Sequence, residues 1–193
     1  MNFKLFIWNL FSRCLGIIGS PKEEWIKIKE EDDSIWQMIT RFLLPLLFIS
    51  ALASMIGSYF HRDESAWTSG LLIIAGLRPL LSISVSLLIS TVAINAMIVT
   101  FRGTQNVNLA FRLVFFSFIP VILVSIILGV WSELYITGLF SLYSFYIMFL
   151  GVRILTDLPH ERESNFSTLS STVILVVYLI ANFILSSFFG AIQ

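Results

Sequence analysis

Five stretches without a charged side chain divide this chain, and each is about as long as a helix that crosses a bilayer. They are residues 42–60, 79–101, 113–132, 134–152 and 164–193. Crossing the hydrocarbon core takes about 20 predominantly apolar residues. The chain is 57% hydrophobic and only 12% charged, whereas soluble domains carry about 25% charged residues. We therefore expect an all-α integral membrane protein, in which a bundle of five transmembrane helices occupies residues 39–193. The expected spans are about 42–60, 79–101, 113–131, 134–155 and 171–190.

The residues before the first span, 1–38, form a cytosolic or interfacial segment. On a helix over 3–18, one face collects Phe3, Phe6, Ile7, Leu10, Phe11, Cys14, Ile17 and Ile18. Asn9, Ser12 and Gly16 lie opposite, with Lys4 and Arg13 at the edges. This pattern predicts an amphipathic helix in the membrane interface, whose basic side chains reach toward headgroups. The alternative is a retained, poorly ordered leader.

A polar helix is predicted next, over residues 21–33. Ser20 can cap it, Pro21 suits its first position, and Glu23 is placed as in a capping box. Trp25 and Ile28 share one face. One interpretation is a solvated helix that leads into the membrane. The other is a docking surface for a partner, built on Trp25 and Trp36.

Serines recur every four residues in the first two spans, at Ser50, Ser54 and Ser58 and at Ser82, Ser86 and Ser90. Small residues at this spacing let helices approach closely inside a bilayer. We expect the two rows to meet, or at least to face protein; a serine-lined water path is the alternative. The other polar residues of the spans are expected to hydrogen-bond across helices: Asn95, Tyr143, Tyr146, Tyr178 and Asn182.

Arg78 needs no burial in the hydrocarbon. It lies 24 residues before Arg102, or about 36 Å at helical rise, which exceeds a core of about 30 Å. Both arginines can thus reach headgroups. Residues 71–77 then extend the helix or lie in the interface, with Trp67 as an anchor. After the fourth span, Arg153 and Asp157 have the i, i+4 spacing of a helix-end ion pair.

The basic residues are sorted to one side. Ten of the 12 Lys and Arg residues precede the first span or fall between spans two and three or four and five, and only Arg62 and Arg78 lie on the other side. Because Lys and Arg in short loops set orientation, we expect a cytosolic N-terminus and an external C-terminus.

The sequence carries no recognisable reactive site. The two histidines, His61 and His160, would lie on opposite membrane faces, and no span holds an acidic residue at mid-depth, where proton-coupled transporters often need one. Phosphate-binding, nucleophile and zinc motifs are missing, and the net charge is zero. We expect no enzyme activity, no catalytic, cofactor-binding or metal-binding residues, and no nucleic-acid partner.

Several segments resemble a known family. Arg112–Pro120 has an aromatic-Ser-x-x-Pro pattern, Leu142–Leu155 is a tyrosine-containing span that ends near a glycine, and Leu158-Pro159 precedes Arg162. Ser20-Pro21 with Trp25 completes the pattern. These residues and the five spans resemble the Yip family of small membrane proteins, named for Rab-GTPase interaction. The chain lacks the Asp-Leu-Tyr-Gly-Pro motif and the longer cytosolic region of eukaryotic members, so Rab binding is not expected. It is most similar to compact bacterial members.

The resemblance implies a bacterial cytoplasmic membrane protein, with an ER or Golgi membrane as the alternative. The expected function is that of a non-enzymatic scaffold or partner of other membrane proteins or of lipid, compatible with a homo-oligomer. Structural roles are expected for Pro120, Tyr143, Gly151 and Trp25. The alternative function is a small transporter or channel component whose polar path is lined by Ser82, Ser86, Asn95 and Asn182.

Overall fold

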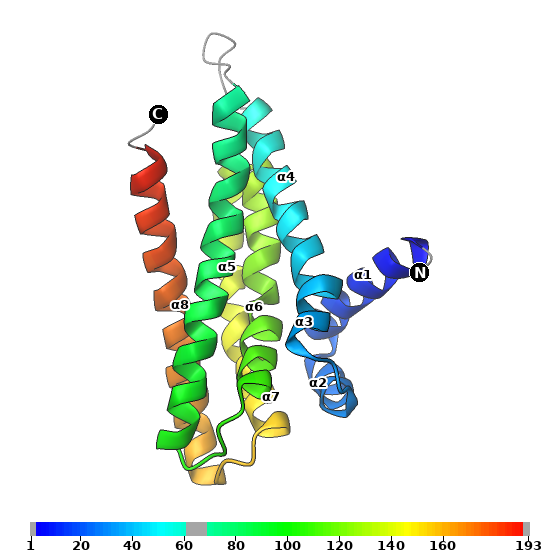
Figure 1. Cartoon of the computed structure of the whole chain (residues 1–193), viewed down its shortest axis with the longest axis vertical. Helices are drawn as coiled ribbons and strands as arrows, with labels where there is room; N and C mark the ends of the chain where they lie inside the picture. Colours follow the sequence, from blue (N-terminus) through cyan, green and yellow to red (C-terminus); the bar gives the residue numbers. More distant parts are fainter. Residues whose placement is uncertain (1–2, 61–68, 191–193) are drawn as a thin grey trace.

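The computed structural model describes residues 3–60 and 69–190, in which all regular elements are helices. Two N-terminal helices, α1 (Phe3–Gly19) and α2 (Pro21–Glu30), lie beside an up-and-down bundle (Figure 1). The bundle contains α3 (Ile35–Met38), the π-helix η1 (Ile39–Leu43), α4 (Leu44–Phe60), α5 (Ser69–Thr100), α6 (Val107–Val130), the 3-10 helix η3 (Ser132–Leu142), α7 (Tyr143–Leu155) and α8 (His160–Gly190).

These elements make five helices that are long and apolar enough to cross a membrane, which confirms the expected fold class. Several extend beyond the predicted ends. The first span begins at Ile35, the second helix at Ser69 and the last at His160, where the sequence predicts 42, 79 and 171. The charge-free windows mark hydrocarbon depth, whereas a helix can continue into the polar layers as long as its backbone is paired. Trp67 and His61 lie outside the described residues.

The first span changes its helical register just before Pro45. Proline has no N–H, and its ring meets the carbonyl four residues earlier. Here the π-turn Ile39–Leu43 precedes it, and the Leu44 N–H bonds to the Ile39 carbonyl, five residues back. The extra residue in this turn adapts the helix to proline. Pro45 thus lies inside the first span, ten residues after its first helical residue, Ile35.

The fourth span is only half α-helical. Residues Ser132–Leu142 form a 3-10 helix with no buried side chain, and α7 continues from Tyr143. A sequence pattern alone predicts a helix here and does not separate the two forms.

Helix α6 is the centre of the bundle. Every residue from Leu113 to Ile122 is buried, and α4, α5, α7 and η3 all pack against it. A helix that is apolar on all sides is expected to be buried on all sides. Pro120 lies inside this helix, which continues on both sides of it.

The second serine row faces protein, as the weaker form of the prediction states, and the first row does so only in part, because Ser54 and Ser58 are half-buried. Ser50 is fully buried, and its hydroxyl lies 3.1 Å from that of Ser125 in α6. Nearby, a Cβ atom on Gly57 would lie 1.9 Å from the carbonyl oxygen of Gly129. The close contact of α4 is therefore with α6. In the second row Ser82, Ser86 and Ser90 are all at most 1% exposed, and the Ser86 hydroxyl donates to the Ser82 carbonyl.

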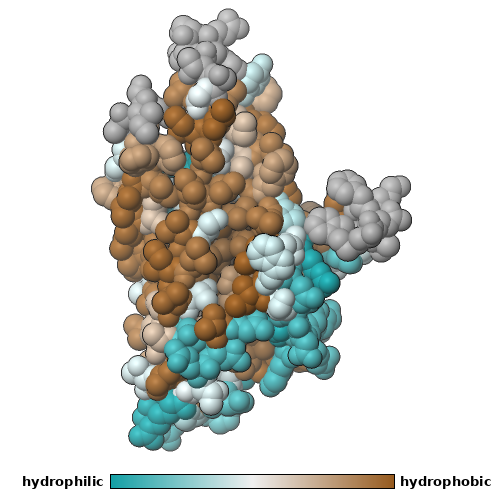
Figure 2. All heavy atoms as spheres, in the orientation of Figure 1, coloured by the Kyte–Doolittle hydropathy of each residue, from teal (hydrophilic) through white to brown (hydrophobic). Residues whose placement is uncertain are grey.

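The surface divides into two zones. Apolar residues cover the bundle, and hydrophilic residues gather at one end (Figure 2). This polar end is formed by α2, residues 101–106 and residues 156–159; the opposite end, where α4 stops and α5 begins, is called the far end. Helix α1 projects sideways from the bundle, above α2 in the view of Figure 1. An apolar belt of this kind belongs in the hydrocarbon of a membrane.

Candidate functional site at the junction of the N-terminal helices and the bundle

Helix α1 is apolar on two faces. Leu10, Cys14 and Ile17 are at most 7% exposed and join the core, whereas Trp8 and Phe11 are 69% and 63% exposed. The sequence assigned Leu10, Cys14 and Ile17 to a lipid-facing side together with Phe11. That assignment is wrong for the three buried residues, because the same apolar periodicity suits a protein neighbour.

Arg13 does not reach toward headgroups, in contrast to the prediction. Its guanidinium donates to Glu24 at 2.7 Å and also pairs with Glu31. It also lies over the rings of Phe42 and Phe116, at 5.6 and 5.9 Å from their centroids. Arg13 and Glu24 are 13% and 7% exposed. Losing one partner of such a buried pair costs about 3–5 kcal/mol.

Trp25 fixes α2 to the bundle. It is fully buried, and its indole N–H donates to the Ile147 carbonyl of α7 at 2.9 Å. A Cβ atom on Gly151 would lie 2.5 Å from the indole ring, so this glycine makes room for it. Trp25 and Gly151, for which the sequence predicts structural roles, thus pack against each other. A docking surface built on an exposed Trp25 is excluded by its burial.

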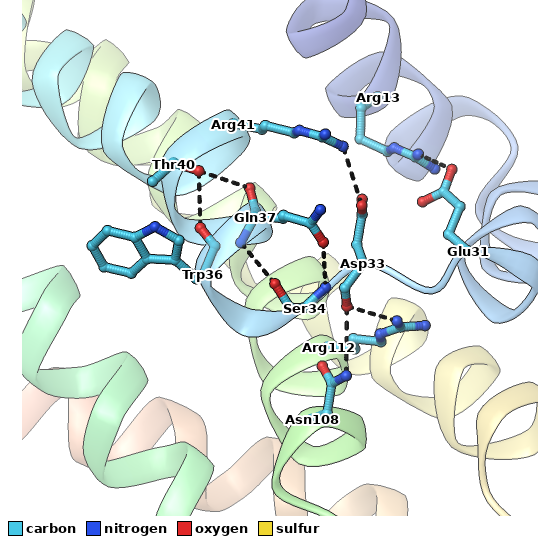
Figure 3. A network of polar contacts seen from close by, with 10 residues as sticks. All are labelled: Arg13, Glu31, Asp33, Ser34, Trp36, Gln37, Thr40, Arg41, Asn108 and Arg112. Carbon is cyan, nitrogen blue, oxygen red and sulfur yellow. Dashed lines mark hydrogen bonds and ion pairs between the residues drawn. The ribbon is translucent and has the colours of Figure 1, made fainter.

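Arg112 of α6 holds the backbone that follows α2. Its two terminal nitrogens donate to the carbonyls of Ile28 and Asp33, at 2.9 and 2.8 Å. The side-chain amide of Asn108 reaches the same Asp33 carbonyl at 3.5 Å, and the Asp33 carboxylate pairs with Arg41 (Figure 3). Residues 31–34 are not helical. The Arg112 guanidinium therefore supplies hydrogen bonds to backbone carbonyls that have no donor within a helix.

The capping box lies at Ser34, before α3, and not at Ser20 as predicted. Ser20 precedes α2, but its side chain makes no capping hydrogen bond, and α2 ends at Glu30 rather than 33. The box forms at Ser34, whose hydroxyl accepts from the Gln37 N–H while the Gln37 side chain accepts from the Ser34 N–H (Figure 3). The Ser-x-x-Gln spacing before an apolar run was the signal that could have found it.

Trp36 points away from this network, and it is 70% exposed (Figure 3). The junction therefore has two sides: a buried side with Arg13, Trp25 and Arg112, and an open side with Trp36 and the exposed residues of α1. We call α1, α2 and residues 31–38 the N-terminal platform.

A second polar group lies where α7 meets α8. Glu163 pairs with Arg153 at 3.5 Å and with His160 at 2.9 Å, and these side chains line a cavity of about 440 Å³. The expected Arg153–Asp157 pair is replaced by this contact, because α7 stops at Leu155 and Asp157 is no longer on its last turn.

The polar residues of the spans behave differently from one another. The Tyr143 hydroxyl donates to the Ile18 carbonyl at 2.9 Å, which joins α7 to α1. Asn182 donates to the Tyr178 carbonyl within its own helix, and Tyr146 is half exposed. The side-chain amide oxygen of Asn95 is buried without a hydrogen-bond partner in the described structure. The prediction of hydrogen bonds across helices holds for Tyr143 and is wrong for Asn182.

Within residues 3–60 and 69–190, no group of three or more His, Cys, Asp and Glu side chains is arranged to hold a metal ion. The one cysteine, Cys14, is buried, and burial raises the pKa of its thiol to about 11. It packs as a small apolar side chain.

Comparison with known proteins adds one match. The model of the Yip1 domain matches residues 15–184, which include α2, the junction and nearly all of the five spans. No curated protein and no solved structure matches the chain. The matched region covers most of the chain, and five helices of membrane-spanning length lie within or across it. The chain belongs to the Yip1 domain family and is an integral membrane protein.

Proposed function

We propose that the protein is a non-enzymatic scaffold that binds other membrane proteins, or lipid, through its N-terminal platform. The observation that carries this proposal is the two-sided build of the platform. Trp25 and Arg112 fix it to the bundle, while Trp8, Phe11 and Trp36 remain 63–70% exposed.

The fixed side of the platform favours binding. A segment that is already ordered loses little conformational entropy when a partner docks on it. Aromatic residues supply large contact areas and dominate many interfaces. The exposed aromatic side chains therefore suit a partner that is partly embedded in the membrane interface.

The charge distribution favours a cytosolic location for the platform. Ten of the 12 Lys and Arg residues precede the first span or lie between spans two and three or four and five, so the polar end would face the cytosol of a bacterial cell. Rab-type GTPases are not part of the proposal, since the chain lacks the eukaryotic Asp-Leu-Tyr-Gly-Pro motif.

Site-specific photo-crosslinking in native membranes tests the proposal. A benzophenone amino acid at Trp36 or Trp8 should give discrete protein adducts. The control position is Val92, which is also 70% exposed but lies within the charge-free stretch 79–101, and it should give lipid adducts. If positions 8 and 36 yield the same products as position 92, the platform is not a protein-docking surface.

The structure gives less support to a transport path. Ser82 and Ser86, two of its expected lining residues, are 1% and 0% exposed, and close packing of this row favours a helix contact over a water channel. Solute movement by the reconstituted protein, without any specific crosslinked partner, would favour transport over scaffolding.

A further inference from the structure

Arg78 lines a polar cavity near the far end of the bundle. The cavity has a volume of about 260 Å³, and its walls come from α4, α5, α6 and α8. Four polar residues accompany the arginine: Ser54, Ser125, Tyr178 and Asn182. Each helix supplies at least one polar group, and Arg78 is the only charged residue on this wall in the described structure.

The depth of Arg78 fits a headgroup layer. Arg78 is nine residues into α5, or about 13 Å from the first residue of that helix. Leu128 and Gly129, in the last turn of α6, line the same cavity. Because α6 ends near this level, we place the cavity toward the headgroup layer of the far end. Arg102 is about 36 Å away at helical rise, near the opposite headgroups.

Among the described residues, no acidic side chain pairs with Arg78. Within residues 3–60 and 69–190, none of the ion pairs includes Arg78. Arg78 is exposed on the described structure, so its guanidinium is accessible to an anion at headgroup level. One turn deeper on the same face of α5, the Ser82 hydroxyl is buried without a hydrogen-bond partner. In the part of the chain that the structure describes, the cavity thus has hydrogen-bond donors and no acidic residue in its wall.

A groove for an apolar chain lies beside this cavity. It has a volume of about 340 Å³, runs between α5 and α8, and is lined only by aliphatic side chains, among them Val85, Ile89 and Ile184. Val85 is two turns beyond Arg78 on α5, so both lie on one face of the helix. On α8 the groove spans the same turns as Tyr178 and Asn182, and on α5 it lies deeper than Arg78. A polar cavity and an apolar groove side by side match the two parts of a lipid.

We propose that the Arg78 cavity binds the phosphate of a phospholipid headgroup, with an acyl chain of the same lipid along the α5–α8 groove. The guanidinium fork matches phosphate oxygens, and the hydroxyl and amide groups of Ser54, Tyr178 and Asn182 supply further donors. A free phosphate ion offers the same oxygens but leaves the apolar groove unused.

Native mass spectrometry of the detergent-purified protein with added phosphatidylglycerol tests this site. Arg78→Gln should weaken lipid binding about tenfold, the equivalent of one charge-assisted hydrogen bond. Arg78→Lys should retain part of the affinity. The matched control is Arg162→Gln, at the polar end, and it should bind as the unaltered protein does. Equal binding by the Arg78→Gln and unaltered proteins would overturn the proposal.

Two further measurements keep the result interpretable. Asn182→Leu removes an amide donor from the cavity and keeps the arginine, so it should also weaken lipid binding even if Arg78→Gln folds poorly. Inorganic phosphate at 10-fold excess should not displace the lipid; displacement would assign the site to a soluble anion and overturn the lipid proposal. The site lies at the opposite end from the N-terminal platform, so neither result depends on the crosslinking at Trp36.

Discussion

Single residues decide how the N-terminal platform is attached. Trp25 occupies space that exists because residue 151 is glycine, and Arg13 is buried because Glu24 and Glu31 accompany it. These contacts join residues more than 100 positions apart in one case and fewer than 20 in the other. A small substitution at one of these positions should therefore destabilise the protein more than the change in side-chain volume alone would predict.

Gly151→Ala should destabilise the protein by about 1–3 kcal/mol, the usual cost of overpacking. The new Cβ atom would meet the Trp25 ring at 2.5 Å, and the buried indole has no free space. Thermal unfolding in detergent measures the change. The matched control is Gly138→Ala, where a Cβ atom would meet nothing within 4 Å. Equal shifts in Tm for both variants would contradict the contact.

Cys14 should be nearly inert toward maleimide in the native protein. Burial raises its pKa to about 11, from a usual 9.0, so at pH 8 the reactive thiolate is about a hundredfold scarcer than in an unfolded chain. Labelling should rise sharply in SDS. The control is Ser12→Cys in a Cys14→Ser background, since Ser12 is exposed on the same helix. Fast native labelling of Cys14 would show that α1 leaves the bundle.

At the scale of elements, helices meet through small residues and backbone carbonyls. The α4–α6 contact rests on Gly57, Gly129 and the Ser50–Ser125 pair. The α2–bundle contact rests on Arg112, which donates to two carbonyls. Lipid is as apolar as leucine, so close van der Waals contact and hydrogen bonds, rather than apolar burial, select these neighbours inside a membrane.

Gly57→Ala should separate α4 from α6 and lower stability by about 1–3 kcal/mol. Its Cβ atom would lie 1.9 Å from the Gly129 carbonyl oxygen, a backbone atom that moves only with its helix. Gly70→Ala is the matched control, because that position has nothing within 4 Å. Resistance to SDS unfolding measures both. A Gly57→Ala variant as resistant as the control would contradict the close approach.

Arg112→Lys should loosen the segment that links α2 to the bundle. A lysine ammonium keeps the charge but has no planar fork for the carbonyls of Ile28 and Asp33. Hydrogen exchange should therefore accelerate for backbone amides of residues 28–38, by about tenfold for one lost charge-assisted bond. Arg162→Lys, on α8, should leave these amides unchanged. If Arg112→Lys leaves the exchange of these amides unchanged, Arg112 does not hold the segment.

At the scale of the whole molecule, charge and apolar surface divide along the bundle axis. Hydrophilic residues gather at the polar end, next to an apolar belt (Figure 2). Orientation in the membrane then depends on the basic residues, because loops rich in Lys and Arg stay on the cytosolic side.

The polar end should face the cytosol. In a Cys14→Ser background, Glu161→Cys at the polar end should react with a membrane-impermeant maleimide only after the membrane is opened. Ser132→Cys, where α6 leads into η3 at the far end, should react in intact cells. Both positions are exposed. The reverse labelling pattern would show that the ten basic residues lie outside.

The sequence by itself determined the number of spans, the helical class and the family, because a bilayer requires long uncharged runs and a paired backbone. It also identified Trp25 and Gly151 as structural residues, without showing that they touch. Helix ends were less predictable: His160–Asn165 continues α8 although it is polar.

Only the tertiary structure decided which apolar face of α1 meets the bundle, which acids pair with Arg13, and that Arg78 shares a cavity with Tyr178 and Asn182. Periodicity shows that a face is apolar, but lipid and protein interior are equally apolar neighbours. Contacts between distant residues depend on how helices cross, and small steric differences at glycines and serines set those crossings.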